Sequence, residues 1–445
     1  MKIEKISVES LFGVFNHEIP FKTDDEITIV IGENGLGKTV ILEAINALFD
    51  KKYRFFADLE FTNFRFYFNN NEIWELTRKS ENGHLSLFIG RDSKITPVKK
   101  IKPYKIYQDQ DDYSRKVKLK DIERLRNDME MDMEFSHRLH DHRDFERELY
   151  YRHMMERRFI NARLMTEDDL KVPNWFLEGL EKVNVRLIET QRIITAKESG
   201  SDSYVSNLNK CSLELKGMID FASRNSSVVA SDLDSTYPNR LVNKLRQGTR
   251  DTFEELNQAL AKLDDRRKSF SEAGLAVKIS DYDLLQIDEK QKDLVNVLKL
   301  YIDDSHKKLD PYQDLLQKII LFKEIINKRF KHKRLEVNRD KGLVFRSTVV
   351  IKSNGKYDEI PHSKLSSGEQ HELILFYKLI FNSQPNDLIL IDEPELSLHI
   401  SWQNKFIRDL KEVTSINDVS IVIATHSPDI IDSNWDLKVE LKGVE

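Results

Sequence analysis

Apolar residues follow a strand-like pattern at both ends of the chain and a helix-like pattern through its middle. Residues 26–31 form a nearly continuous run of β-branched residues, which is typical of a strand buried on both faces. Every second residue from Phe64 to Phe68 is a phenylalanine, and Asn82-Gly83 is a hairpin signal, so antiparallel strands are predicted around them. Asn354-Gly355 predicts another hairpin near the other end.

From about residue 115 to residue 335 the sequence is charged and has the period of helices. An apolar seam with coiled-coil spacing is formed by Phe253, Leu256, Leu260, Leu263 and Phe270. After a break near residues 271–283, a second helical run carries Leu315, Ile319, Phe322 and Ile326. Two such runs around one break suggest an antiparallel helical hairpin, and the pattern fits a projecting arm and a compact lid equally well.

The two strand-rich ends predict a single α/β domain that is interrupted by a helical insertion. We place its first half at residues 1–110, the insertion at 111–337 and its second half at 338–445. A chain of 445 residues with 40% hydrophobic and 33% charged residues is long enough for such a domain and has a folded protein's composition.

Composition also limits where the protein works. A single cysteine, Cys211, excludes an internal disulfide framework and favours a reducing compartment. We find no secretory signal and no apolar stretch long enough to span a membrane, so we expect a cytoplasmic protein. A net charge of -5 gives no general attraction to nucleic acid.

One glycine-rich segment fits the phosphate-loop pattern G-x-x-x-x-G-K-[ST] between the buried strand and a helix-like run. Glycines let the backbone come close to phosphates, and the amides at a helix start point toward them. Lys38 would neutralise the β- and γ-phosphates of ATP, and the Thr39 hydroxyl would bind Mg²⁺. The expected nucleotide contacts come from Asn34, Gly35, Gly37, Lys38 and Thr39.

A second apolar strand, residues 388–391, ends in two carboxylates, Asp392 and Glu393. Ligands of α/β sheets bind at the carboxyl ends of the strands, where these side chains emerge. We expect Asp392 to hold Mg²⁺ and Glu393 to act as the general base that activates water. Paired acids can also simply cap a following helix, but the phosphate loop makes this alternative weak.

One further segment distinguishes between classes of phosphate-loop proteins. It reads Leu365-Ser366-Ser367-Gly368-Glu369-Gln370. It resembles the ABC signature in the L-S-x-G-E form of structural-maintenance and recombination proteins, and it differs where Ser367 replaces the commonest glycine. The resemblance covers residues 1–110 and 338–445. It implies an ABC-type head in which Ser366 and the Gly368 backbone contact the γ-phosphate of ATP held by a second copy. The same residues also fit an ordinary helix N-cap with a capping box.

The same resemblance implies roles for three further positions. His426 follows the next strand and matches the family's switch histidine, which contacts the γ-phosphate. Residues 395–399 occupy the D-loop position and are similar to the E-x-S-L-H form of overcoming-lysogenization-defect and related defence ATPases. The glutamine of a Q-loop is expected near the end of the first half, where Gln108 and Gln110 are candidates.

Two groups of basic residues could contact nucleic-acid phosphates. One lies between Lys94 and Lys105, and the other runs from Lys328 to Arg334. The first group also fits a loop over the nucleotide, and the second fits a helix end that favours cations. Direct DNA binding therefore stays open, and we favour the interpretation without it.

Three functions are consistent with the resemblance. The chain is similar to the AriA-type sensor ATPase of PARIS anti-phage systems, which forms a homo-oligomer and holds a separate TOPRIM-type effector nuclease until a phage-encoded trigger protein appears. It is also similar to the ATPase of Septu-like systems, which works with an HNH nuclease. The third alternative is a DNA-repair ATPase of the RecF or SMC type.

The absence of recognisable nuclease and zinc-hook motifs favours a defence function over repair. Nineteen residues follow His426, so we expect no C-terminal TOPRIM domain, and no HNH pattern occurs elsewhere. The lone Cys211 cannot form the cysteine pair of a zinc hook. We therefore expect a homo-oligomeric, slowly hydrolysing ATPase, with any nuclease activity coming from a partner.

Overall fold

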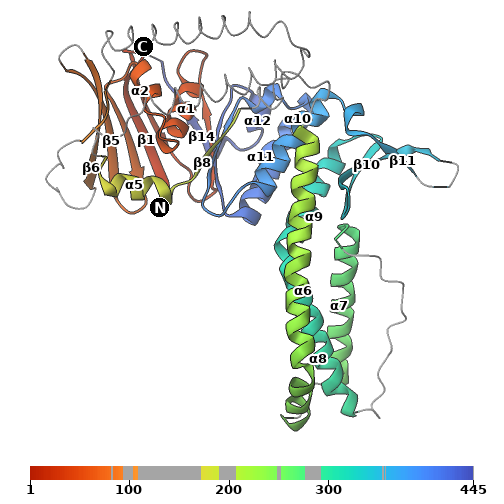
Figure 1. Ribbon diagram of the computed structural model, residues 1–445. Helices are drawn as coiled ribbons and strands as arrows, with labels where there is room; N and C mark the ends of the chain where they lie inside the picture. Colours follow the sequence, from red (N-terminus) through yellow and green to blue (C-terminus); the bar gives the residue numbers. More distant parts are fainter. Residues whose placement is uncertain are drawn as a thin grey trace, which may run out of the picture. The chain divides into compact units, whose positions relative to one another are not determined.

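Figure 1 shows the computed structural model, which describes residues 1–81, 84–93, 104–108, 172–189, 207–247, 252–275, 292–352, 355 and 357–443. The chain divides into two compact units. The first, which we call the head, comprises Met1–Tyr204 and Gln384–Glu445, and the second, which we call the helical unit, comprises Val205–Ser383. These divisions differ from the sequence boundaries after residues 110 and 337.

One half of the head is an antiparallel sheet with the strand order β2-β1-β4-β5-β6-β7. Its hairpin β5–β6 pairs Glu81 with His84, as the Asn-Gly signal predicts. On β4 the even-numbered phenylalanines are fully buried, since alternate side chains of a strand share one face. The strands are β1 (Ile3–Leu11), β2 (Phe15–Pro20), β4 (Asn63–Phe68), β5 (Glu72–Glu81), β6 (His84–Ser93) and β7 (Tyr104–Gln108).

The other half of the head is an all-parallel sheet with the order β14-β3-β13-β12-β8. The phosphate loop follows β3, and the two acids end β12, so β13 lies between the two motifs. At the edge, β8 pairs with β12 although the sequence assigned its residues to the insertion. The strands are β3 (Ile27–Ile31), β8 (Val185–Glu189), β12 (Leu388–Asp392), β13 (Ser420–Ala424) and β14 (Lys438–Glu440).

Helix α1 packs between the two sheets, and one apolar core joins all three elements. Helix α5 closes this core beside Trp74, where a Cβ on Gly179 would lie 2.2 Å from the indole ring, so only glycine permits the contact. The head helices are α1 (Lys38–Phe49), α2 (Arg54–Asp58), α5 (Asn174–Lys182), α11 (Ile400–Asn417) and α12 (Pro428–Ile431), with short 3₁₀ turns at Pro394–Leu396 and Trp435–Leu437.

The helical unit is built around α6, whose 41 residues span about 60 Å at a rise of 1.5 Å per residue. Leu256 and Leu263 of the predicted seam pack against Val295 and Ile302. The seam's partner is therefore α8, which the sequence analysis did not identify, and not the run at 315–326. The helices are α6 (Asn207–Gln247), α7 (Phe253–Glu272), α8 (Lys292–Leu309), α9 (Gln313–Arg329) and α10 (Ser367–Phe381), with 3₁₀ turns at Asp310–Tyr312 and His362–Lys364.

A small antiparallel sheet of order β11-β10-β9 completes the helical unit. Its strands are β9 (Lys333–Asn338), β10 (Gly342–Ile351) and β11 (Tyr357–Ile360). The predicted fold class is confirmed: an α/β head carries an antiparallel lobe and is split by a large helical region. None of the described helices is both long and apolar enough to cross a lipid bilayer.

Candidate nucleotide site

The phosphate loop connects β3 to α1, and glycine is required at its end. Gly37 is the N-cap of α1 and has a φ of 90°. A Cβ at this position would lie 2.6 Å from Leu11 Cδ2. Gly35 has a φ of 88°, and a Cβ there would meet no atom within 4 Å. The loop therefore needs glycine for its conformation, and its exposed tip at Asn34 and Gly35 leaves open space for a phosphate.

Lys38 is buried at the first position of α1 and turns back over its own loop. Its Nζ donates hydrogen bonds to the carbonyl oxygens of Gly32, at 2.7 Å, and Glu33, at 3.0 Å. Burial lowers the pKa of Lys38, and the carboxylates of residues 392–395 oppose this shift. The ammonium group is thus held by backbone oxygens, which it can exchange for phosphate oxygens.

His17 supports the phosphate loop from β2, a role for which the sequence carries no motif. The ring is buried, and its Nε2 donates a hydrogen bond of 2.9 Å to the Leu36 carbonyl oxygen. Burial lowers the pKa of His17, although the bond to Leu36 opposes this effect. The neutral ring therefore fixes the loop just before Gly37 without adding a charge.

Thr39 and Asp392 meet across the sheet although they are far apart in the sequence. The Thr39 hydroxyl donates a hydrogen bond of 3.1 Å to Asp392 Oδ1. Burial raises the pKa of Asp392 to about 6, partly offset by the Thr39 hydrogen bond, and the nearby Glu393 carboxylate adds to the rise. One hydroxyl and one carboxylate fit Mg²⁺, which binds proteins through few oxygen ligands and keeps several waters.

Glu393 adopts an unusual backbone conformation directly after Asp392. Its φ of 46° and ψ of 57° place a residue with a side chain in the left-handed region, which costs about 1–3 kcal/mol. Its amide donates to the Ala424 carbonyl at 2.9 Å. In this conformation Glu393 Oε1 lies 3.5 Å from His426 Nε2. The two predicted catalytic side chains are therefore brought together from the neighbouring strands β12 and β13.

Glu395 fixes the turn that carries His426. One of its carboxylate oxygens accepts a 2.8 Å hydrogen bond from the Thr425 hydroxyl, and the other accepts a 3.1 Å bond from the His426 amide. The His426 ring lies 3.6 Å from the same carboxylate, whose side chain is only 10% exposed. The sequence placed Glu395 in the D-loop position without a role, and its contact with a residue 31 positions away could not be read from a motif.

The signature segment lies in the helical unit and forms the start of α10. Ser366 is the N-cap, and its side chain and Glu369 form a reciprocal capping box. Lys333 of β9 binds the same Glu369 carboxylate at 2.7 Å. Ser366, Ser367 and Gly368 are exposed, and a Cβ on Gly368 would meet no atom within 4 Å. The capping box is thus present, and it leaves the small residues of the turn accessible.

A buried ion pair holds α10 against α9. Arg329 Nε lies 3.0 Å from Glu372 Oε1, and the two side chains are 2% and 0% exposed. The guanidinium group also lies over the ring of Phe376, 4.5 Å from its centroid. Removing one partner of such a pair costs about 3–5 kcal/mol, because it leaves a buried charge uncompensated. The signature turn therefore sits on a helix that is firmly fixed to α9.

The topology does not bring the Q-loop candidate Gln108 to the carboxyl edge of the parallel sheet. Gln108 ends β7 of the antiparallel sheet, and Gln110 lies outside the described residues. The last residue of β8, Glu189, is the register partner of Asp392 in the parallel sheet, so β8 ends at this edge. Gln191 follows two positions later in the sequence, also outside the described residues.

A family model for AAA ATPase domains, AAA_15, matches residues 1–431. The chain belongs to this AAA ATPase family. Membership agrees with the phosphate loop, the acidic end of β12 and the Thr39–Asp392 contact, and it implies that the site binds a nucleotide. No curated protein shows significant similarity to the chain.

Three of the solved structures to which the chain is similar are head domains of SMC proteins. One is the Pyrococcus furiosus Smc head domain with an extended coiled coil, bound to the C-terminal domain of ScpA, at 12% identity over 97% of this chain and 91% of that one, with a TM-score of 0.33. Another is the Thermotoga maritima SMC head domain, at 10% identity over 97% and 92%, with a TM-score of 0.34. A third, the SmcHead bound to the C-winged helix domain of ScpA, shows 12% identity over 98% and 92%, with a TM-score of 0.33.

The buried Asp392 carboxylate predicts a pH-dependent gain in stability for Asp392→Asn. A group whose folded pKa is raised to about 6 destabilises the fold above that pH, because the unfolded chain loses its proton more readily. Without nucleotide and Mg²⁺, the variant should therefore unfold at a higher temperature than the natural protein at pH 7.5. The difference should shrink as the pH falls through 6 toward 4.

Thermal unfolding followed by circular dichroism over this pH range measures the effect. Asp436→Asn, on the head's surface and away from the site, is the matched control and should show no such pH trend. A variant that is equally stabilised, or destabilised, at every pH would contradict a burial-raised pKa at Asp392.

Proposed function

We propose that this chain hydrolyses ATP with Mg²⁺ in sites that are shared between two copies, and that it is the sensor ATPase of a bacterial anti-phage complex with a separate effector nuclease. One observation carries the enzymatic part: Lys38, the Thr39–Asp392 pair and the Glu393–His426 pair all lie at the carboxyl ends of three adjacent parallel strands. Ligands of parallel α/β sheets bind at this edge.

ATP binding would use groups that are already in place. The amides at the start of α1 would bind phosphate oxygens, helped by the helix dipole. Lys38 would exchange the carbonyls of Gly32 and Glu33 for the β- and γ-phosphates. Thr39 and Asp392 would hold Mg²⁺, which neutralises charge on the phosphates when bound.

Hydrolysis needs a base beside the γ-phosphate and a group that positions the water. Glu393 would accept the proton of the attacking water, since it follows the strand end that carries the metal ligand Asp392. His426, 3.5 Å from Glu393, would contact the γ-phosphate and orient the water. Glu395 acts as a positioning residue, because it fixes the His426 turn through two hydrogen bonds.

The signature turn would complete the site of a second copy. Ser366 and Gly368 are exposed at the N-terminus of α10, where amides and the helix dipole favour an anion. The γ-phosphate would then join two copies, and its loss on hydrolysis would release them. This proposal rests on the resemblance to the ABC signature together with the accessible geometry of the turn.

The defence role is supported by the resemblance to AriA-type sensor ATPases of PARIS systems. In this proposal the ATP-bound homo-oligomer holds a TOPRIM-type nuclease, and a phage-encoded protein triggers its release. The helical unit, which contains the 41-residue α6, offers a surface for such partners. Within it, the Arg329–Glu372 pair fixes α9 to the signature helix α10. The Septu-like and repair functions differ in their partners, and the last experiment below distinguishes them.

Glu393→Gln should reduce steady-state ATP hydrolysis by about 10²–10⁴-fold while leaving ATP binding intact, because only the general base is lost. Lys38→Ala should instead lose ATP binding. Phosphate release and binding of a fluorescent ATP analogue measure the two effects. Glu412→Gln, a carboxylate on α11 away from the site, is the control and should hydrolyse normally. An unchanged rate in Glu393→Gln would show that another group is the base.

Shared sites predict that two inactive variants restore each other. Lys38→Ala disables the phosphate loop, and Ser366→Arg blocks the signature turn. In a mixed dimer one site carries both defects and the other carries neither, so an equal mixture should regain roughly a quarter of the natural ATPase rate. If both elements acted within one chain, mixing would restore nothing, and the shared-site proposal would be abandoned.

Phage challenge of bacteria that express the chain with its neighbouring genes tests the biological role. We expect protection that requires both the ATPase and a neighbouring nuclease, and that Lys38→Ala abolishes. Co-purification should show the nuclease bound to the natural chain. A TOPRIM nuclease supports the proposal, whereas an HNH partner favours the Septu-like function. Protection from DNA damage without a nuclease partner favours repair.

A further inference from the structure

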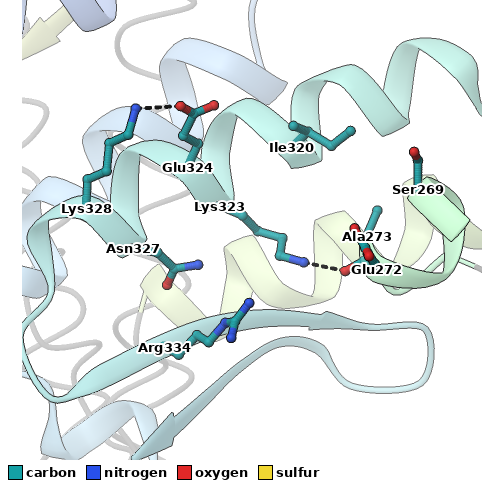
Figure 2. Close-up of a pocket in the computed structure, with 9 residues that line it drawn as sticks. All are labelled: Ser269, Glu272, Ala273, Ile320, Lys323, Glu324, Asn327, Lys328 and Arg334. Atoms are coloured by element: carbon teal, nitrogen blue, oxygen red, sulfur yellow. Dashed lines mark hydrogen bonds and ion pairs between the residues drawn. The ribbon is translucent and has the colours of Figure 1, made fainter. Parts of the chain in front are cut away.

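A cavity lies entirely within the helical unit. It has a volume of about 410 Å³ and lies between the end of α7, one face of α9 and the start of β9 (Figure 2). Cavities that bind small molecules usually measure about 300–1,000 Å³. The described residues that line it carry three cationic and two carboxylate side chains.

Two of these cations, Lys323 of α9 and Arg334 of β9, line the same cavity. Figure 2 shows the Lys323 side chain reaching from α9 toward Glu272 at the end of α7, and the Arg334 side chain reaching from β9 into the same cavity. Lys323 Nζ donates a hydrogen bond to the Glu272 carbonyl at the end of α7. Burial lowers the pKa of Lys323, and the positive charge of Arg334 lowers it further, while Glu336 and Glu272 oppose the shift. The cavity therefore holds two cations that repel each other.

Arg334 is the more available of the pair. Within the part of the chain that the structure describes, no hydrogen bond or ion pair engages its guanidinium group. Its cross-strand neighbour in β10 is a further arginine, Arg346, which is paired with Glu336. Like charges directly opposite each other in a sheet are unfavourable unless something neutralises them. Glu336 already neutralises Arg346, and an anion beside Arg334 would neutralise the second arginine of the pair.

The other charges at the cavity do not fill this need. Lys328 is paired with Glu324 on the same helix, so the two neutralise each other. The Glu272 carboxylate lies on the exposed rim. The amide side chain of Asn327 is engaged with the backbone of Leu335. The anion that fits best is a phosphate group, because a guanidinium and an ammonium together match its several oxygens.

The remaining wall of the cavity is apolar. Ile320 of α9 lines the cavity and is 44% exposed, and Ala273, which follows α7, lines it as well and is buried. Together they offer a surface next to the cations that a ligand could cover. We propose that this cavity binds a phosphate monoester with an apolar or planar body, the phosphate between Lys323 and Arg334 and the body against Ile320 and Ala273.

Titration calorimetry of the full chain with phenyl phosphate tests this site. Lys38→Ala is used as the background, because it removes binding at the phosphate loop. We expect phenyl phosphate to bind and inorganic phosphate to bind more weakly. Arg334→Gln should weaken phenyl phosphate binding about tenfold or more, as expected for a lost hydrogen bond to a charged group. Because Arg334 is exposed, this substitution should not disturb folding.

Two matched variants separate the parts of the site. Ile320→Ser should weaken the binding of phenyl phosphate and leave that of inorganic phosphate unchanged. Lys331→Gln removes a nearby exposed cation that does not line the cavity, and it should bind as the background does. The proposal is overturned if phenyl phosphate does not bind, if Arg334→Gln has no effect, or if inorganic phosphate binds equally well. If a short DNA duplex binds more tightly than phenyl phosphate and this binding depends on Arg334, the proposal is overturned in favour of a nucleic-acid surface.

Discussion

The hydrogen bond between Thr39 and Asp392 is the contact on which the nucleotide site depends, because it joins residues 353 positions apart. It can form only if the strands before the phosphate loop and before the acidic pair belong to one parallel sheet with β13 between them. That order also places His426 beside Glu393. The insertion must therefore leave β3 free to join β13 and β12 in one sheet. The nucleotide motifs can then lie on either side of the insertion in the sequence and still meet.

The sequence predicts those parts of the protein whose chemistry is local. The phosphate loop, the acidic end of β12 and the strand before His426 each lie within a few consecutive residues, and the fold class follows from them. The five residues of β8 could not be recognised, since a short apolar segment inside charged sequence becomes a strand only through its pairing with β12. The contacts of Glu395 and His17 were missed for the same reason, because both depend on partners brought close by tertiary structure.

The signature segment shows why two interpretations of one sequence need not exclude each other. A capping box uses the Ser366 side chain and Glu369 to satisfy the first amides of α10. It also holds the turn rigid while Ser367 and Gly368 stay exposed. Lys333 and the buried Arg329–Glu372 pair fix the same helix from β9 and α9. If the turn contacts a phosphate held by a second copy, as proposed, this rigidity would help, since less conformational freedom is lost on binding.

Burial shifts the pKa values of Lys38 and Asp392 in opposite directions, and the proposed metal–nucleotide complex would oppose both shifts. It lowers the pKa of Lys38 and raises that of Asp392 to about 6, so each group is held in an environment that disfavours its charged form. Phosphate oxygens would stabilise the ammonium group, and a divalent cation would stabilise the carboxylate. The two groups lie at one edge of the sheet, where the carboxylates already oppose the fall in the Lys38 pKa. In the proposed function, a complex of metal and nucleotide would stabilise both charged groups at once, which neither component would do by itself.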